Sequence, residues 1–183
     1  MVDLVLEGVD PGIVDTALTA LRLDFDRREL HVYSKVWNNV TRRERNKAII
    51  DEEFLKDIEV STLEPLGSNQ AATFLGIEGY RQRGMNLYQD QAMLAMVDRL
   101  EEVLPRAVII DNIGMKQIVT VPLLKLFHVN RFSKSSNHAD RVSAARVALR
   151  RGIMDEDINK LLSDYVLDNL EGRTWSLEST QTV

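Results

Sequence analysis

Three acidic residues stand where their carboxylates could act together. Asp10 ends a mainly apolar run and directly precedes a Pro-Gly turn signal. Glu78 ends a second apolar stretch, residues 71–77, and Asp140 lies at the start of a predicted helix. Carboxylate oxygens are the hard ligands that Mg²⁺ prefers. Two Mg²⁺ ions about 3.5–4 Å apart can activate a water molecule and stabilise the leaving oxygen in phosphodiester hydrolysis.

Each acid also has a structural explanation. Asp, Pro and Gly favour turns, so Asp10 fits a plain strand-ending turn. Glu78 fits an exposed strand end, and Asn137-x-x-Asp140 fits a helix N-cap followed by an acid in the first turn. The functional interpretation therefore depends on the three acids taken together and in order.

The elements that must hold these acids follow an α/β pattern. In the first part of the chain, a Thr41-x-x-Glu44 capping box predicts a helix that continues through Leu55. Before it, apolar alternation predicts an antiparallel three-stranded meander, formed by the first strand ending at Asp10 and by strands at 17–25 and 31–37.

Helices and strands alternate in the rest of the chain, which predicts parallel pairing in a mixed sheet. We expect buried strands at 71–78 and 106–111 and helices at 87–103, 138–151 and 155–170. The stretch 115–127 is ambiguous and is compatible with a short helix, and residues 130–137 are polar and loop-like.

Charge is unevenly distributed along the 183 residues, whose net charge is −5. The segment 106–151 is basic and the segment 152–183 is acidic, which favours a polyanion-binding face, although solvated helix faces would look the same. The chain has no cysteine and no apolar run of the roughly 18–20 residues that span a bilayer. We therefore expect an intracellular, cytoplasmic protein without a membrane partner.

The ordered set of motifs resembles the RuvC family of Holliday-junction resolvases, in a compact form such as bacteriophages encode. The resemblance covers about residues 4–151 and is carried by Gly8-Val9-Asp10-Pro11-Gly12, Ile77-Glu78, Lys116-Gln117-Ile118-Val119 and Asn137-His138-Ala139-Asp140 before an Ala-rich helix. One departure stands out. The family's last motif usually supplies two metal-facing groups three residues apart, and here the first of them is Asn137.

The resemblance implies an RNase H-like mixed sheet, in which an antiparallel three-strand meander is followed by parallel strands and flanked by helices. It implies a nuclease domain over 1–152, to which we add an acidic helix over 153–171 and a disordered tail over 172–183. It also implies Mg²⁺ as cofactor, with Mn²⁺ able to substitute. Asp10 would bridge two metals, and Glu78 and Asp140 would each bind one of them.

The resemblance further implies that Lys116 neutralises the scissile phosphate. Helix geometry places Asn137 on the same face as Asp140, so Asn137 is a candidate metal ligand. His138 is a candidate ligand or proton shuttle, but it can reach the metal only if the helix begins after it.

Branched DNA is the implied partner. The resemblance makes Tyr80 an aromatic group that stacks on or wedges between bases. Backbone phosphates would be held by the cluster 42–47 and by other cations, namely Arg81, Arg83, Arg131, Lys134, Arg141, Arg146 and Arg150. A four-way junction presents two related strands, which suits a homodimer, with the helix at 87–103 as a candidate interface. The alternatives are a nuclease for flaps or RNA–DNA hybrids and a non-catalytic protein that binds branched nucleic acid.

Overall fold

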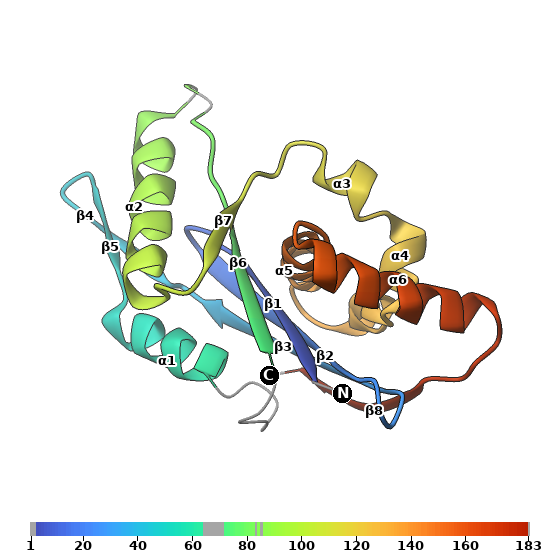
Figure 1. Cartoon of the computed structure of the whole chain (residues 1–183). Coiled ribbons are helices and arrows are strands. Elements are labelled where there is room, and N and C mark those ends of the chain that lie inside the picture. Colours follow the sequence, from blue (N-terminus) through green and yellow to red (C-terminus); the bar gives the residue numbers. More distant parts are fainter. Residues whose placement is uncertain (1–2, 64–71, 83, 85, 183) are drawn as a thin grey trace.

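The computed structural model describes residues 3–63, 72–82, 84 and 86–182 and shows a six-stranded mixed sheet between helices (Figure 1). The strand order is β7-β6-β1-β2-β3-β8. Strands β1, β2 and β3 form the predicted antiparallel meander, and β6, β7 and β8 pair in parallel with their neighbours. The bounds are β1 Leu4–Asp10, β2 Asp15–Asp24, β3 Glu29–Asn38, β6 Ala72–Glu78, β7 Val108–Ile110 and β8 Ser176–Thr182. This arrangement confirms the predicted RNase H-like mixed sheet.

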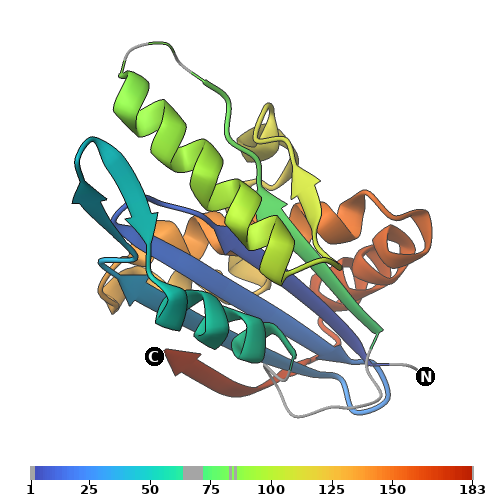
Figure 2. The ribbon, with the colours of Figure 1, turned by 90° about the vertical axis from the view of Figure 1, so that its left-hand side faces the viewer.

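Helices cover both faces of the sheet (Figures 1 and 2). Two lie on one face, α1 Glu52–Leu63 and α2 Leu87–Val103. The other face carries α5 and its neighbours, with bounds α3 Met115–Ile118, α4 Val121–Leu126, the 3₁₀ helix η1 Val129–Lys134, α5 His138–Ile153 and α6 Glu156–Leu170. The helices predicted at 87–103, 138–151 and 155–170 are therefore confirmed. In the parts of the chain that are described, none of the helices has the length and apolar character needed to cross a membrane.

Side chains of β1 alternate between two hydrophobic cores, as the period of two in a strand requires. Leu4 and Leu6 pack in the core beneath α5, together with Leu149. Val9 packs in the core beneath α1 and α2, together with Ile58. By this alternation Asp10, the last residue of β1, points to the α5 side of the sheet.

Gly8 lets α5 lie directly on β1. A Cβ atom at this position would lie 2.0 Å from the carbonyl oxygen of Ala144 and 2.3 Å from the backbone nitrogen of Ala148. No side chain larger than hydrogen fits there without moving the helix. The close approach brings the first turns of α5 to the end of β1, where Asp10 lies.

The helix predicted from Thr41 is wrong. Residues 41–50 form a separate two-stranded hairpin of β4 Thr41–Glu44 and β5 Lys47–Ile50, and α1 begins only at Glu52. Arg45 and Asn46 adopt positive φ angles of 45° and 68°, which suit a tight hairpin turn and interrupt any helix. The Thr41 hydroxyl donates to the carbonyl oxygen of Ile13 at 2.5 Å instead of capping a helix.

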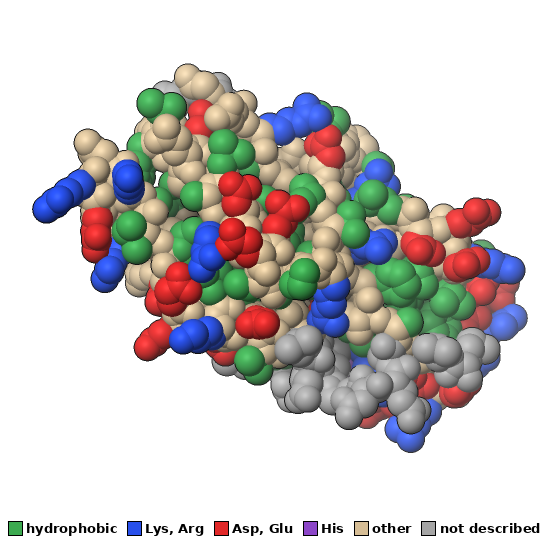
Figure 3. Space-filling view, turned by 60° about the vertical axis from the view of Figure 1, so that its left-hand side comes forward, with side chains coloured by type: hydrophobic (Ala, Val, Ile, Leu, Met, Phe, Trp, Pro, Cys, Tyr) green, Lys and Arg blue, Asp and Glu red, His purple; other side chains and the backbone are tan. Residues whose placement is uncertain are grey.

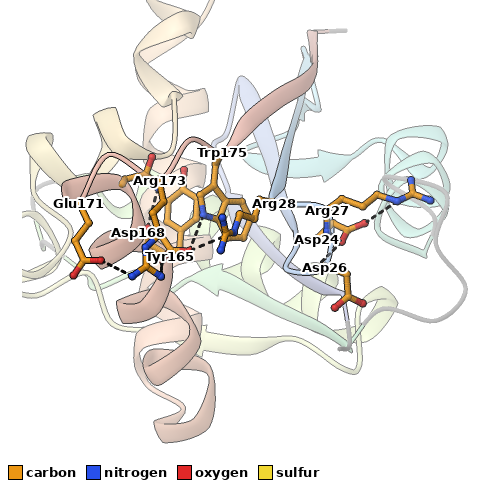
Figure 4. Close-up of polar contacts among 10 residues, drawn as sticks. Asp24, Asp26, Arg27, Arg28, Tyr165, Asp168, Glu171, Arg173 and Trp175 are labelled. Carbon is orange, nitrogen blue, oxygen red and sulfur yellow. Dashed lines mark hydrogen bonds and ion pairs between the residues drawn. The ribbon is translucent and has the colours of Figure 1, made fainter.

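The tail expected to be disordered from residue 172 instead forms β8 over 176–182. Asp168 on α6 anchors the segment between α6 and β8, because its carboxylate accepts from the indole Nε1 of Trp175 and from Arg173, both at 3.3 Å (Figure 4). The Trp175 ring lies edge-on to Tyr165 and Phe25, with centroids 4.7 and 5.3 Å apart. These nonlocal contacts hold the chain beside β3.

Two smaller expectations also change. The strand at 106–111 was expected to be buried, but β7 is an edge strand and Val108 and Ile109 are more than one-third exposed. The polar stretch 130–137 is not all loop, because η1 occupies its first half and buries Phe132. Within 115–127, α3 is the short helix with which this stretch was compatible, and α4 follows it.

Candidate active site

Asp10 and Glu78 end neighbouring parallel strands. Gly8 pairs with Gly76 and Val9 with Ile77, so the next residue of each strand reaches the same end of the sheet. The two carboxyl groups share a hydrogen bond. Burial, and then the charge of Glu78, raises the pKa of Asp10 from 3.8 to about 8. Asp10 therefore holds its proton to a higher pH than an ordinary aspartate does, which allows that proton to lie between the two acids.

Ser143 on α5 completes this group. Its hydroxyl donates to Oε2 of Glu78 at 3.3 Å and also hydrogen-bonds to Asp10, which lowers the pKa of that acid against the larger effect of burial. Ser143 was not among the predicted site residues, because the family motif places the companion of Asp140 three residues before it, at Asn137. Ser143 lies three residues after Asp140 and therefore on the same face of the helix, so this spacing could have predicted it.

Asp140 lies in an adjoining group around the first turn of α5. Burial raises the pKa of Asp140, the charge of Asp15 raises it further, and His138 opposes the change. Asp140 in turn makes the smallest contribution to the raised pKa of Asp10. Asp15, at the start of β2, was also not among the predicted site residues, although it lies only five residues after Asp10.

The three predicted acids therefore do not form one compact cluster. Among the described residues, no three or more Asp, Glu, His or Cys side chains lie together in a way that could hold a metal ion. Asp10 and Glu78 form the compact pair, and Asp140 belongs to the neighbouring group.

Asn137 and His138 do not join Asp10 and Glu78. Asn137 adopts a left-handed conformation, and its side-chain amide donates to Oδ1 of Asn38 at 2.9 Å and to Asp15 at 3.5 Å. Asn137 thus ties α5 to the start of β2 and the end of β3, and its role as a metal ligand stays a prediction. His138 is itself the first helical residue and is exposed, so the condition for its reaching a metal is not met.

A hollow of 490 Å³ opens beside the carboxyl pair, lined by Glu78, Asn112, Gly114, Met115, Lys116, Gln117, Ser143 and Arg146. Lys116 reaches this hollow from α3, where the resemblance had placed a phosphate-neutralising lysine. Arg146 comes from α5, one turn after Ser143, and its Nε atom is buried without a hydrogen-bond partner among the described residues. Two cations facing a carboxyl pair form a surface suited to a phosphate group.

The residues predicted to contact DNA have different surroundings. The Tyr80 hydroxyl donates to Oδ1 of Asp90 at 2.5 Å, so the ring is tied to α2, and its stacking role stays a prediction. Arg81 forms an exposed ion pair with Asp111 at 2.7 Å. Arg83 lies outside the described residues.

Three further cations lie on the α5 side of the chain. Arg131 and Lys134 are exposed on η1. Arg141 is only 4% exposed, and its Nη1 donates to the carbonyl oxygen of Ser34 at 2.8 Å. The prediction that Arg141 contacts DNA is therefore wrong, because its guanidinium group holds α5 against β3 inside the protein.

The donor set fits a divalent cation of the magnesium type. Asp10, Glu78 and Ser143 offer only hard oxygen atoms, and two carboxyl groups this close repel each other unless a proton or a cation lies between them. A metal ion bound by Asp10 and Glu78 would replace the shared proton.

No protein-family model and no curated protein matches this chain. Among solved structures, Thermus thermophilus RuvC in complex with a Holliday junction substrate matches 80% of this chain and 91% of its own, at 17% identity and a TM-score of 0.45. A second T. thermophilus RuvC structure covers 80% and 92%, at 16% identity and a TM-score of 0.42. The nuclease domain of the large terminase of bacteriophage SPP1, with bound Mn, covers 81% and 86%, at 10% identity and a TM-score of 0.33. These likenesses are distant, and the sheet order and strand directions identify the fold.

Proposed function

We propose that this chain is a magnesium-dependent endonuclease that hydrolyses phosphodiester bonds in four-way or other branched DNA. The observation that carries the proposal is the Asp10–Glu78 carboxyl pair at the edge of a hollow lined by Lys116 and Arg146. Acids for a metal and cations for a phosphate then face the same space. The preference for branched DNA rests on the resemblance of the motifs to the RuvC family.

Each residue has a defined part in this chemistry. Asp10 and Glu78 would hold Mg²⁺, which supplies an activated water and neutralises charge on the phosphate. Ser143 orients the Glu78 carboxylate through its hydrogen bond. Lys116 and Arg146 hold the non-bridging phosphate oxygens and orient the scissile bond toward the carboxyl pair.

A two-fold homodimer is part of the proposal, because a four-way junction presents two equivalent strands to be cut. Helix α2 remains the proposed contact, since its first residue, Leu87, is 71% exposed. Sedimentation of the free protein and of its junction complex should both give a dimer mass. A monomer in both states would contradict this part of the proposal.

A second candidate function is binding of branched DNA without cleavage. It is favoured by the absence, among the described residues, of a group of three acids or histidines that could hold one ion, and by the neutral Ser143 beside the pair. The two functions share a fold and differ in the outcome of one experiment.

That experiment incubates labelled four-way junction, duplex, flap and RNA–DNA hybrid with the wild-type protein in Mg²⁺, in Mn²⁺ or in EDTA. The Asp10→Asn variant tests the site, and Asp164→Asn, an exposed change on α6, is the matched control. Paired junction nicks that need metal and Asp10 support the proposal. Cleavage of flaps or hybrids alone would mean that the proposed site is active on a different substrate. Tight junction binding without cleavage in either metal would support the second candidate function.

A further inference from the structure

The hairpin of β4 and β5 stands apart from the main sheet. It forms its own two-stranded sheet and projects from the end of the molecule at which β1 and β6 finish (Figures 1 and 2). A two-stranded ribbon is marginal by itself and needs support from the rest of the fold. Here the guanidinium group of Arg43 lies over the ring of Tyr88 on α2, 4.6 Å from the ring centre.

The base of the hairpin is bonded to the loop that follows Asp10. The backbone nitrogen of Val40 donates to the carbonyl oxygen of Val14 at 3.0 Å, and the Thr41 hydroxyl donates to that of Ile13 at 2.5 Å. Only Pro11 and Gly12 separate this loop from Asp10. The hairpin therefore has a set position relative to the candidate active site.

The tip of the hairpin is strongly basic. Its exposed cations, set against the single acid Glu44, are Arg42, Arg43, Arg45 and Lys47. Arg42 pairs with Glu44 at 3.1 Å, but within the described part of the chain neither Arg45 nor Lys47 has an acidic partner at ion-pair distance. Figure 3 shows Lys and Arg side chains on the part of the surface that projects at its left.

The neighbouring face is acidic, which sharpens the contrast. Exposed acids cover the outer sides of α1 and α2, and they include Glu53, Glu59, Asp98, Glu101 and Glu102 (Figure 3). An acidic face would repel a polyanion, whereas the basic hairpin would attract one.

We infer that the β4–β5 hairpin is a nucleic-acid-binding arm that grips the phosphate backbone of a duplex adjoining the cleavage site. This inference rests on the proposed function for the position of the cut. The charge and shape of the hairpin do not depend on that function. A two-stranded ribbon fits the major groove of B-form DNA, and unpaired cations at its turn lie where the backbone phosphates of that groove run.

The test measures binding in EDTA, so that no cleavage occurs, using a labelled 30-base-pair duplex and a four-way junction over a range of salt concentrations. The variant Arg45→Asn/Lys47→Gln removes two charges, and Asn tolerates the positive φ of position 45. Each lost phosphate contact lowers the salt slope by about 0.9, so the slope should fall by about 1.8. If both proteins bind equally at 1 M salt, this corresponds to about 30-fold weaker binding at 0.15 M.

Three controls make the result specific. Lys56→Gln/Lys160→Gln removes two exposed charges elsewhere and should leave the slope unchanged. Arg45→Lys/Lys47→Arg keeps both charges and should bind like the wild type, which excludes a folding defect. Poly-glutamate should compete far less well than duplex DNA, because only DNA offers a groove for the ribbon.

An unchanged salt slope in the hairpin variant overturns the inference, and so does an equal fall of the slope in the Lys56/Lys160 control. The inference also fails if poly-glutamate competes as well as duplex DNA does, or if the wild-type protein binds neither the duplex nor the junction. Failure of the proposed function looks different. A wild type that binds through the hairpin but cuts nothing keeps the arm and removes the nuclease, whereas normal cleavage with an unchanged slope removes the arm alone.

Discussion

Two acids on β1, three residues apart, have similarly raised pKa values in very different surroundings. Glu7 faces α1 and α2, is fully buried and has a pKa raised from 4.5 to about 8 by burial, against the opposing charge of Arg106. Its Oε2 accepts from Arg106 at 3.1 Å, and its Oε1 has no partner among the described residues. Asp10 faces α5 at the strand end, and its partner is another acid, Glu78.

The comparison shows that a raised pKa does not by itself define an active site. Glu7 is sealed in a core, where its neighbour is a cation that also donates to the carbonyl oxygen of Thr62. Asp10 has an acid as neighbour and adjoins an open, cation-lined hollow. Access and the sign of the neighbouring charge, rather than burial, separate a structural acid from a candidate catalytic one.

The sharpest test of this difference exchanges each acid for its amide. Asp10→Asn should lower the cleavage rate by about 10³-fold or more, because the carboxyl pair loses a charge needed for the metal. Glu7→Gln should leave cleavage within about threefold of the wild type, since Gln keeps the shape and the acceptor for Arg106. Single-turnover cleavage of a junction measures both. Equal loss in the two variants would erase the distinction.

Gly8→Ala tests how α5 reaches the site. The added methyl group would collide with the backbone of α5 at Ala144, so we expect a loss of about 3 kcal/mol in the free energy of unfolding and a marked loss of cleavage. Val5→Ala, a buried change on the face of β1 that points away from α5, should cost about 2 kcal/mol but keep cleavage. Urea unfolding and cleavage assays on both variants provide the measurement, and an active Gly8→Ala protein would contradict the packing argument.

Stability against pH should report both acids. In the unfolded chain they titrate near 4.5 and 3.8, and in the folded protein both titrate near 8. Between these values the folded state binds more protons, so the free energy of unfolding should fall as the pH rises from about 4 to about 8. Each group contributes at most about 1.4 kcal/mol per pH unit.

Urea unfolding in EDTA at several pH values between 5 and 8 measures this slope, which Glu7→Gln and Asp10→Asn should each make shallower. Mg²⁺ should remove the Asp10 part alone, because a bound cation takes the place of the proton. A slope that neither variant changes would show that these two acids do not control the pH dependence.

Ser143→Ala should have a smaller effect than Asp10→Asn. Its hydroxyl lies 3.3 Å from Glu78, a long hydrogen bond, so we expect cleavage at limiting Mg²⁺ to fall by about tenfold and to recover at high Mg²⁺. A Mg²⁺ titration of the cleavage rate separates this from a folding defect. Ser163→Ala on the exposed side of α6 is the matched control and should titrate like the wild type.

Local patterns predicted much of the fold and the centre of the site. Alternation at β1 to β3 and helical spacing in α2, α5 and α6 depend on neighbours along the chain, which the sequence displays directly. Asp10 and Glu78 were identified because a carboxylate that ends a buried strand must lie at the end of the sheet where that strand finishes. Their adjacency follows from parallel pairing of the two strands.

The errors arise where distant contacts outweigh local ones. The Thr41-x-x-Glu44 pattern fits a helix cap, but the Thr41 hydroxyl bonds to Ile13 and the chain turns at Arg45. The polar tail has weak patterning, yet Trp175 and Asp168 hold it beside β3.

The sequence by itself determined strands β1, β2, β3, β6 and β7, helices α2, α5 and α6, and the two acids that end β1 and β6, because these follow from side-chain periodicity and strand ends. Only the tertiary structure decided that Ser143 rather than Asn137 meets the acids, that Arg141 is buried, and that the basic segment 42–47 projects as a hairpin. Those outcomes depend on how closely α5 approaches Gly8 and on where the loop after Asp10 holds β4. Such distances are set by packing between residues far apart in the chain.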